Sequence, residues 1–308
     1  MKTIPQKMKL RLQLNSWLIT IALASMAAVP VTSEKATAYL SVDHGVTWQR
    51  ADAGFPEDEN INAVIAHNKL VYAGTDRHGV LAMDRNGWSV QSRGLPKGAR
   101  VLSLLSYNHV IYAGLYRGGL YFSSDDGYNW TRMGRNNETN VRALGEFKGV
   151  IYAGTDEGIY SVDLRSGSWE LLLGKQQINT FASNGSYLYG GTHQGVVRSD
   201  DGIHWEQVFE GAAINQIAFN QSDVSIMDYS ENVFRGVLDK PTFVKEDIYL
   251  PHTHYFRLTP TSGKLIGTEW SDISFYNSVN RRGLPANTPL NILIRTPFGL
   301  LAASKGGC

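Results

Sequence analysis

Cysteine is almost absent from this sequence: the only one among its 308 residues is Cys308, at the last position. A single thiol excludes an intramolecular disulfide and a zinc site built from several cysteines. Charge of either sign is also scarce, since 19% of the residues are charged and the formal net charge is +1. Such a balanced chain has no global field that attracts nucleic acid or an acidic membrane, so we expect no nucleic-acid partner.

Sequence signatures of common catalytic and cofactor sites are missing as well. The chain contains no Gly-x-Ser-x-Gly, no P-loop and no dinucleotide-binding fingerprint. His252 and His254 can face the same way on a strand, a geometry that metals use. Two imidazoles alone make an incomplete ligand set, so a pair of solvent-facing histidines is the better interpretation. We expect neither a metal nor a cofactor.

Glycine and aromatic residues, by contrast, are abundant. The chain has 31 glycines, 15 tyrosines and 7 tryptophans, and 43% of its residues are apolar. Glycine-rich turns together with aromatic side chains are typical of many short β-strands rather than of long helices. The apolar fraction is large enough to build a core.

The N-terminus has the composition of an export signal. Basic residues at 2, 7, 9 and 11 precede a mostly apolar stretch over residues 12–31, and Ala36-Thr37-Ala38 is a candidate cleavage site. We therefore predict a signal peptide over residues 1–38 and an exported chain, secreted or periplasmic. An uncleaved membrane anchor is the alternative, because the apolar stretch approaches the ~20 residues that span a bilayer.

One strand-like segment recurs along the chain. Its four clearest copies, Leu70–Thr75, Val110–Leu115, Val150–Thr155 and Tyr187–Thr192, carry Gly74, Gly114, Gly154 and Gly191, which are 40, 40 and 37 residues apart. Weaker copies follow at residues 225–228, 264–267 and 300–303. This period fits a four-stranded β-propeller blade of about 40 residues.

The two chain ends complete each other in this repeat. Residues 290–301 correspond to the first two strands of a blade, and residues 38–48 correspond to its third and fourth strands. Pairing them in one composite blade closes the ring and removes its exposed edges. With six internal blades, the sequence predicts an all-β, seven-bladed propeller that forms a single domain over residues 39–308.

A turn motif between the third and fourth strands recurs three times. It reads Ser41-Val-Asp43-His-Gly45-Val-Thr47-Trp48, Ser123-Ser-Asp125-Asp-Gly127-Tyr-Asn129-Trp130 and Arg198-Ser-Asp200-Asp-Gly202-Ile-His204-Trp205. In this motif the chain resembles the Asp-box (BNR-repeat) propellers, which include sialidases, sortilin-type receptors, xyloglucanases and photosystem II assembly factors. We expect the aspartates to accept hydrogen bonds within their turns, the glycines to adopt positive φ, and the tryptophans to pack between sheets.

The resemblance indicates the fold more than an activity. A sialidase needs an arginine triad and an early Phe/Tyr-Arg-Ile-Pro motif, whereas the faintly similar segments here, residues 255–260 and 294–297, both lie late. A glycan-processing enzyme stays open as an alternative, and it would need Asp76, Asp156 or Glu157 close together with a raised pKa.

Polar residues are predicted to surround the mouth of the central channel. The position before each innermost strand reads Asn62, Leu102, Arg142, Asn179, Gln216, Tyr255 and Asn291. Loops between second and third strands add Asp76, Arg77, His78, Tyr116, Arg117, Asp156, Glu157, His193 and Trp270. A concave funnel with such groups is a default ligand site. We expect it to bind a protein or glycan partner; the alternative is a mouth that contacts only water.

Overall fold

The computed structural model describes residues 38–57, 59–134, 139–219, 222–230, 232–239, 241–246 and 292–303, and the backbone of short strands between residues 259 and 279. The chain divides into two compact units, residues 1–35 and 36–308, and the description concerns the second. The predicted signal peptide or anchor therefore lies outside the described residues. Within the described part, no helix is long and apolar enough to cross a membrane.

The described secondary structure is a succession of short strands. The first fourteen are β1 (Ala38–Ser41), β2 (Gln49–Arg50), β3 (Ile61–His67), β4 (Leu70–Thr75), β5 (Val80–Asp84), β6 (Gly87–Val90), β7 (Val101–Tyr107), β8 (Val110–Leu115), β9 (Gly119–Ser123), β10 (Thr131–Met133), β11 (Val141–Phe147), β12 (Val150–Thr155), β13 (Gly158–Val162) and β14 (Trp169–Gly174). The others are β15 (Ile178–Ser183), β16 (Leu188–Thr192), β17 (Gly195–Ser199), β18 (Glu206–Glu210), β19 (Ile214–Phe219), β20 (Asp223–Asp228), β21 (Val233–Val237), β22 (Val244–Lys245), β23 (Thr259–Thr261), β24 (Lys264–Thr268), β25 (Ile273–Phe275), β26 (Ser278–Val279), β27 (Ile292–Thr296) and β28 (Gly299–Ala303).

These strands form four-stranded antiparallel sheets, each built from strands that follow one another in the chain. The exception is the sheet in the order β2-β1-β28-β27, which joins both chain ends. In it, β1 pairs with β28 from Ala38 opposite Ala303 to Ser41 opposite Leu300. The predicted pairing of the two ends is thus present.

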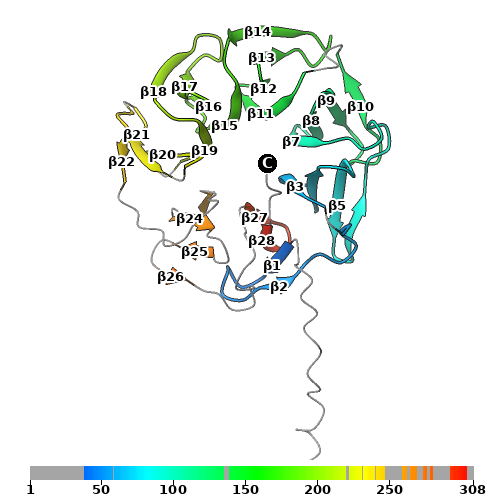
Figure 1. Ribbon diagram of the computed structural model, residues 1–308. Coiled ribbons are helices and arrows are strands. Elements are labelled where there is room, and N and C mark those ends of the chain that lie inside the picture. Colours follow the sequence, from blue (N-terminus) through cyan, green and yellow to red (C-terminus); the bar gives the residue numbers. More distant parts are fainter. Residues whose placement is uncertain are drawn as a thin grey trace, which may run out of the picture. The chain divides into compact units, whose positions relative to one another are not determined.

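The innermost strands of neighbouring sheets contact each other in the series β27, β3, β7, β11, β15, β19 and β23. Within this unit the sheets follow one another around a common centre, with these strands nearest to it (Figure 1). Such a radial arrangement of four-stranded antiparallel sheets is a β-propeller.

The predicted number of seven blades is wrong, because only six of the described sheets are complete blades. Six sheets are blades with described packing: the composite sheet and those of β3–β6, β7–β10, β11–β14, β15–β18 and β19–β22. A further four-stranded sheet, β23–β26, has strands of only two to five residues and is described through its backbone pairing alone. We therefore describe a six-bladed propeller. The repeat has faded in residues 259–279, so this sheet lacks the pattern that builds a full blade.

The recurring glycine of the second strand has a steric cause. A Cβ atom on Gly74 would lie 2.6 Å from Cγ1 of Val101, the residue that begins the innermost strand of the next blade. At Gly154 the corresponding distance is 2.7 Å, to Cγ2 of Ile178. Since carbon atoms in contact lie about 3.5–4.0 Å apart, a side chain here would push neighbouring blades apart. The glycine period found in the sequence therefore marks where blades touch.

The Asp43 turn shows the expected local bonding. The Asp43 carboxylate accepts hydrogen bonds from the backbone N–H of Thr47 at 2.8 Å, the Thr47 hydroxyl at 2.6 Å and the Ser41 hydroxyl at 2.8 Å. Bonds from Thr47, and then from Ser41, lower the pKa of Asp43 to about 2. Gly45 has the expected positive φ of 89°.

The second copy of the motif repeats this bonding. Asp125 accepts from the Asn129 backbone at 2.9 Å, from its side-chain amide at 2.7 Å and from the Ser123 hydroxyl at 2.8 Å. The φ of Gly127 is 83°. Asp125, like Asp43, has a structural role in its turn, as predicted.

In the third copy the structure corrects the assignment by one residue. Asp201, not Asp200, accepts from the backbone and imidazole of His204, at 2.8 and 2.6 Å, and from Ser199 at 3.0 Å. This turn has one residue fewer between its aspartate and Gly202, whose φ is 81°, so matching by the glycine selected the wrong carboxylate. The contact with His204 lowers the pKa of Asp201 and raises the pKa of His204.

Two of the tryptophans that close these turns contact the preceding blade, as expected, and the third is buried. Trp130 packs in a cluster with Tyr72 and Val80 of the preceding blade, and its indole N–H donates to the Gln91 carbonyl at 2.7 Å. Trp205 packs against the cluster of Phe147 and Tyr152. Trp48, in the composite blade, is 4% exposed.

Candidate functional site

A β-bulge begins the innermost strand of five blades. In each, the pairing of the first two strands shifts by one residue, so one residue per blade is left without a partner across the ladder. These bulged residues are Asn62, Leu102, Arg142, Asn179 and Asn215. Bulges are common beside functional sites because they re-aim a side chain.

This register corrects one predicted mouth residue. Gln216 pairs with Met227 and is 8% exposed, whereas Asn215 occupies the bulge. The repeat in this blade is weak, so the sequence pattern places the bulge one residue too late. Tyr255, Asn291 and Trp270 belong to the predicted mouth set but lie outside the described residues.

The loop after each second strand lies beside the bulge, because Ile61 opposes Thr75 in the antiparallel pair. The side-chain amide of Asn62 accordingly donates to Asp76 at 2.8 Å and to the carbonyl of Val101 in the next blade at 3.1 Å. Arg142 pairs in the same way with Asp156. The structure thus brings together bulge and loop residues that are 14 positions apart in the sequence.

The Asp76 carboxylate accepts from several donors in this part of the mouth. It takes hydrogen bonds from Asn60 at 2.9 Å and from Asn62, and an ion pair from Nε of Arg100 at 2.8 Å. Burial by itself would raise the pKa of Asp76, but the donors Asn62 and Asn60 and the charge of Arg100 outweigh it and lower the pKa. Asp76 therefore acts here as a fixed anion.

Sequence reasoning missed Glu59, which supports this loop from below. Its side chain is fully buried, accepts from the backbone N–H groups of Asn60 at 2.9 Å and Asp76 at 3.2 Å, and contacts the imidazole of His78. Nε of Arg77 lies 3.9 Å from the same carboxylate. Glu59 precedes the innermost strand in a loop without any repeat signal, so only its burial identifies it.

Arginine and tyrosine side chains continue the network into the next blade. The guanidinium groups of Arg100 and Arg117 lie 5.6 and 5.4 Å from the ring centre of Tyr116, within the range of cation–π attraction. The backbone N–H of Arg117 donates to Asn140 at 2.7 Å, and Asn140 in turn contacts Asp156. A connected polar surface therefore runs across three blades, from Glu59 to Arg142. We call it the mouth network.

The remaining predicted residues are bonded separately. Glu157 accepts from the hydroxyl of Tyr160 at 3.0 Å. Nδ1 of His193 accepts from the backbone N–H of Gln177 at 3.2 Å, and the Gln177 side chain donates to Asn179 at 2.6 Å. Among the described residues, no group of three or more His, Cys, Asp or Glu side chains is placed to hold a metal ion.

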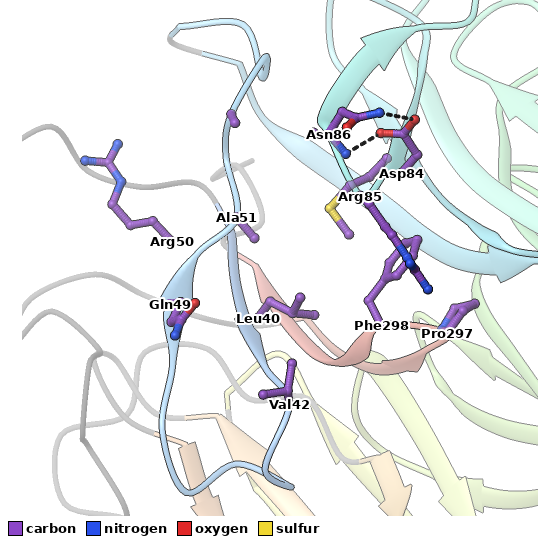
Figure 2. A pocket seen from close by; sticks show the side chains of 13 residues that line it. Leu40, Val42, Gln49, Arg50, Ala51, Asp84, Arg85, Asn86, Pro297 and Phe298 are labelled. Atoms are coloured by element: carbon purple, nitrogen blue, oxygen red, sulfur yellow. Dashed lines mark hydrogen bonds between the residues drawn. The ribbon is translucent and has the colours of Figure 1, made fainter.

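A cavity of about 480 Å³ lies away from the mouth, between the composite blade and the β5–β6 turn. Leu40 and Phe298 line its apolar part (Figure 2), together with Met83. Its polar groups are bonded locally: the Asn86 backbone and side chain donate to Asp84, and Arg50 pairs with Asp52. No sequence pattern indicated this cavity, since its walls come from both chain ends.

Comparisons with known proteins point to the same fold. Residues 56–171, less than half of the chain, match the family described as a DUF6242 β-propeller domain. No curated protein sequence matches the chain.

Three solved structures are similar in fold. The extracellular domain of a hybrid two-component system from B. thetaiotaomicron superposes with a TM-score of 0.65 and 13% identity over 82% of this chain. An ancestral GH74 enzyme superposes with a TM-score of 0.59 and 15% identity over 81% of this chain. BamB from Moraxella catarrhalis superposes with a TM-score of 0.56 and 13% identity over 80% of this chain. The match covers 39%, 39% and 85% of those three chains, so this chain spans well under half of the first two. The repeat, the sheet order and these likenesses together make the chain a β-propeller.

Proposed function

We propose that this chain is an exported, non-catalytic recognition module that binds a partner through the mouth network. The observation that carries the proposal is the connected surface from Glu59 to Arg142, whose side chains are held by hydrogen bonds and ion pairs. A surface fixed before binding loses little side-chain entropy on association. Arginine and tyrosine, which are enriched at interfaces, form its centre in Arg117 and Tyr116.

A protein partner fits this surface better than a glycan. The network extends over three blades, and the guanidinium groups of two arginines lie 5.6 and 5.4 Å from the centre of the Tyr116 ring, where they compete with a sugar for stacking. The exposed Arg117 side chain offers a planar fork that suits a carboxylate. BamB and the extracellular domain of the two-component system share the fold, and this likeness concerns the fold alone.

Export and the Asp-box assignment form part of the proposal. The basic and apolar start of the chain supports a signal peptide or anchor over residues 1–38, ahead of a propeller domain over 39–308. Three turns with the same pattern of carboxylate acceptors support membership of the Asp-box propellers.

A glycan-processing enzyme is the weaker candidate. Its general acid would need a raised pKa, whereas the pKa of Asp76 is lowered. The described carboxylates of the mouth network also bond to basic or amide groups rather than facing each other.

Affinity capture tests the proposal. The full chain should retain a partner from the exported fraction of its host, and Arg117→Ala with Arg142→Ala should weaken capture about tenfold or more, as expected for interface hot spots. Arg165→Ala, an exposed arginine of the turn after β13, is the matched control and should bind normally. Equal capture by all variants would contradict the proposal, and binding to a glycan array alone would replace the protein partner by a glycan.

A further inference from the structure

At the opposite end of the blades, Ser106, His67 and Asp126 form a hydrogen-bonded chain. Oγ of Ser106, in β7, lies 2.7 Å from Nδ1 of His67 at the end of β3. Nε2 of the same imidazole lies 3.2 Å from Oδ1 of Asp126, in the turn between β9 and β10. The chain thus joins two neighbouring blades, β3–β6 and β7–β10 (Figure 1).

The solvent exposure of Ser106 and the burial of His67 suit a nucleophile that is supported by a buried base. The Ser106 residue is exposed to solvent, whereas the side chain of His67 is 3% exposed. The imidazole packs edge-on against Tyr72, with ring centres 6.0 Å apart. Of the serine and the histidine, therefore, the serine is the one open to an incoming molecule.

Asp126 is held in place by the preceding blade. The side-chain amide of Asn68 donates to its carboxylate at 2.6 Å, and the hydroxyl of Tyr72 donates to its backbone carbonyl at 2.8 Å. Two groups lie beside Nε2 of His67: the Asp126 carboxylate, which can only accept, and the side-chain nitrogen of Asn68 at 3.1 Å, which can only donate. When the proton is on Nε2, the imidazole donates to Asp126 and the lone pair of Nδ1 can accept the Ser106 proton; this is the tautomer that a general base at His67 requires.

We propose that Ser106 is an activated nucleophile, with His67 as its general base and Asp126 as the positioning residue. Nucleophile, base and orienting group within hydrogen-bond reach are the signature of covalent catalysis, and it is recognised by geometry rather than by chain order. No assignment of this kind follows from the sequence, because the three residues lie in different strands and turns.

The reaction assigned to this site is acyl transfer from small esters that reach the serine from solvent. Oγ attacks the acyl carbon while its proton passes to Nδ1 of His67. The carbon–oxygen bond to the leaving alcohol breaks, and that alkoxide takes the proton from the imidazolium. The products are an acyl-serine and an alcohol; water then releases the acid by the same path and restores the serine.

A fluorophosphonate probe tests this directly, because its phosphorus reacts with activated serines and expels fluoride. The full chain should be labelled at Ser106, located by mass spectrometry of the modified peptide. Ser106→Ala should abolish labelling, and His67→Gln should slow it about 100-fold, within the range of general-base effects. Ser124→Ala removes an exposed serine of the same turn region and is the matched control, with labelling unchanged.

A second variant guards against a failure to fold. Asp126→Asn changes an exposed side chain, keeps its shape and should slow labelling about tenfold or more at an unchanged unfolding temperature. Two results would show that the three side chains only link two blades: labelling of Ser106 no faster than that of Ser124, or labelling that neither His67→Gln nor Asp126→Asn changes. Either result would leave the mouth network untouched.

Discussion

The docking of a turn onto the preceding blade can be measured at Gly202. This residue has φ of 81°, and a Cβ atom on it would lie 1.9 Å from the hydroxyl of Tyr152. Gly185 has nearly the same φ, 86°, but nothing within 4 Å of its Cβ position. The two glycines therefore share the conformational constraint and differ in the steric one.

Substitution by alanine separates the two effects. Each change costs about 1–2 kcal/mol because an L-residue enters the left-handed region. Gly202→Ala adds overpacking against Tyr152, worth about 1–3 kcal/mol. We expect Gly202→Ala to lower the free energy of unfolding by about 2–5 kcal/mol, and Gly185→Ala by about 1–2 kcal/mol.

Urea denaturation followed by tryptophan fluorescence provides the assay. Adding Tyr152→Phe to Gly202→Ala removes the clashing oxygen and leaves Cζ at 2.9 Å as the nearest atom, so part of the loss should return. A double-mutant cycle should give a coupling of about 1 kcal/mol. Equal destabilisation by the two glycine variants, or no coupling to Tyr152, would refute the steric reasoning.

Three further predictions concern single groups. Both Trp130→Phe and Trp205→Phe remove buried ring volume, but only Trp130 loses a hydrogen bond, because the buried N–H of Trp205 has no partner among the described residues. Thermal unfolding should therefore show Trp130→Phe to be about 0.5–1.5 kcal/mol more destabilised than Trp205→Phe. Glu59→Gln should speed amide exchange of the loop after β4, and unchanged exchange would contradict its role as a tether. The pKa of Asp43 is lowered to about 2, so its carboxylate stabilises the fold at pH values above the unfolded pKa near 3.8, and this contribution is lost as the pH falls towards 2. Asp43→Asn should therefore make the free energy of unfolding depend less steeply on pH in this acid range.

The sequence alone identified the features whose causes are local or repeated. The turn at Asp43 closes within eight residues, so its hydrogen bonds follow from Ser41, Asp43 and Thr47 directly. The glycine period indicated four-stranded units, because each copy meets the same neighbour, as Gly74 meets Val101. Pairing of the chain ends was also predictable, since the missing strands of one repeat stand at opposite termini.

The sequence was misleading where the repeat changes by one residue or fades. A shorter turn put Asp201 in the place assigned to Asp200, and a bulge put Asn215 in the place assigned to Gln216. Both errors are single-residue shifts that spacing cannot detect but hydrogen bonding resolves. The prediction of a seventh complete blade failed for a related reason, because residues 259–279 keep too little of the pattern.

Only the tertiary structure decided which polar groups meet. Asp76 and Arg100 lie in different blades, and Ser106, His67 and Asp126 come from three separate strands and turns. Glu59 carries no motif at all, yet it is a buried carboxylate at one end of the mouth network. Strands and turns depend on interactions within a few residues, so the local sequence predicts them. Contacts between blades depend on how each sheet packs on the next, which the local sequence does not specify.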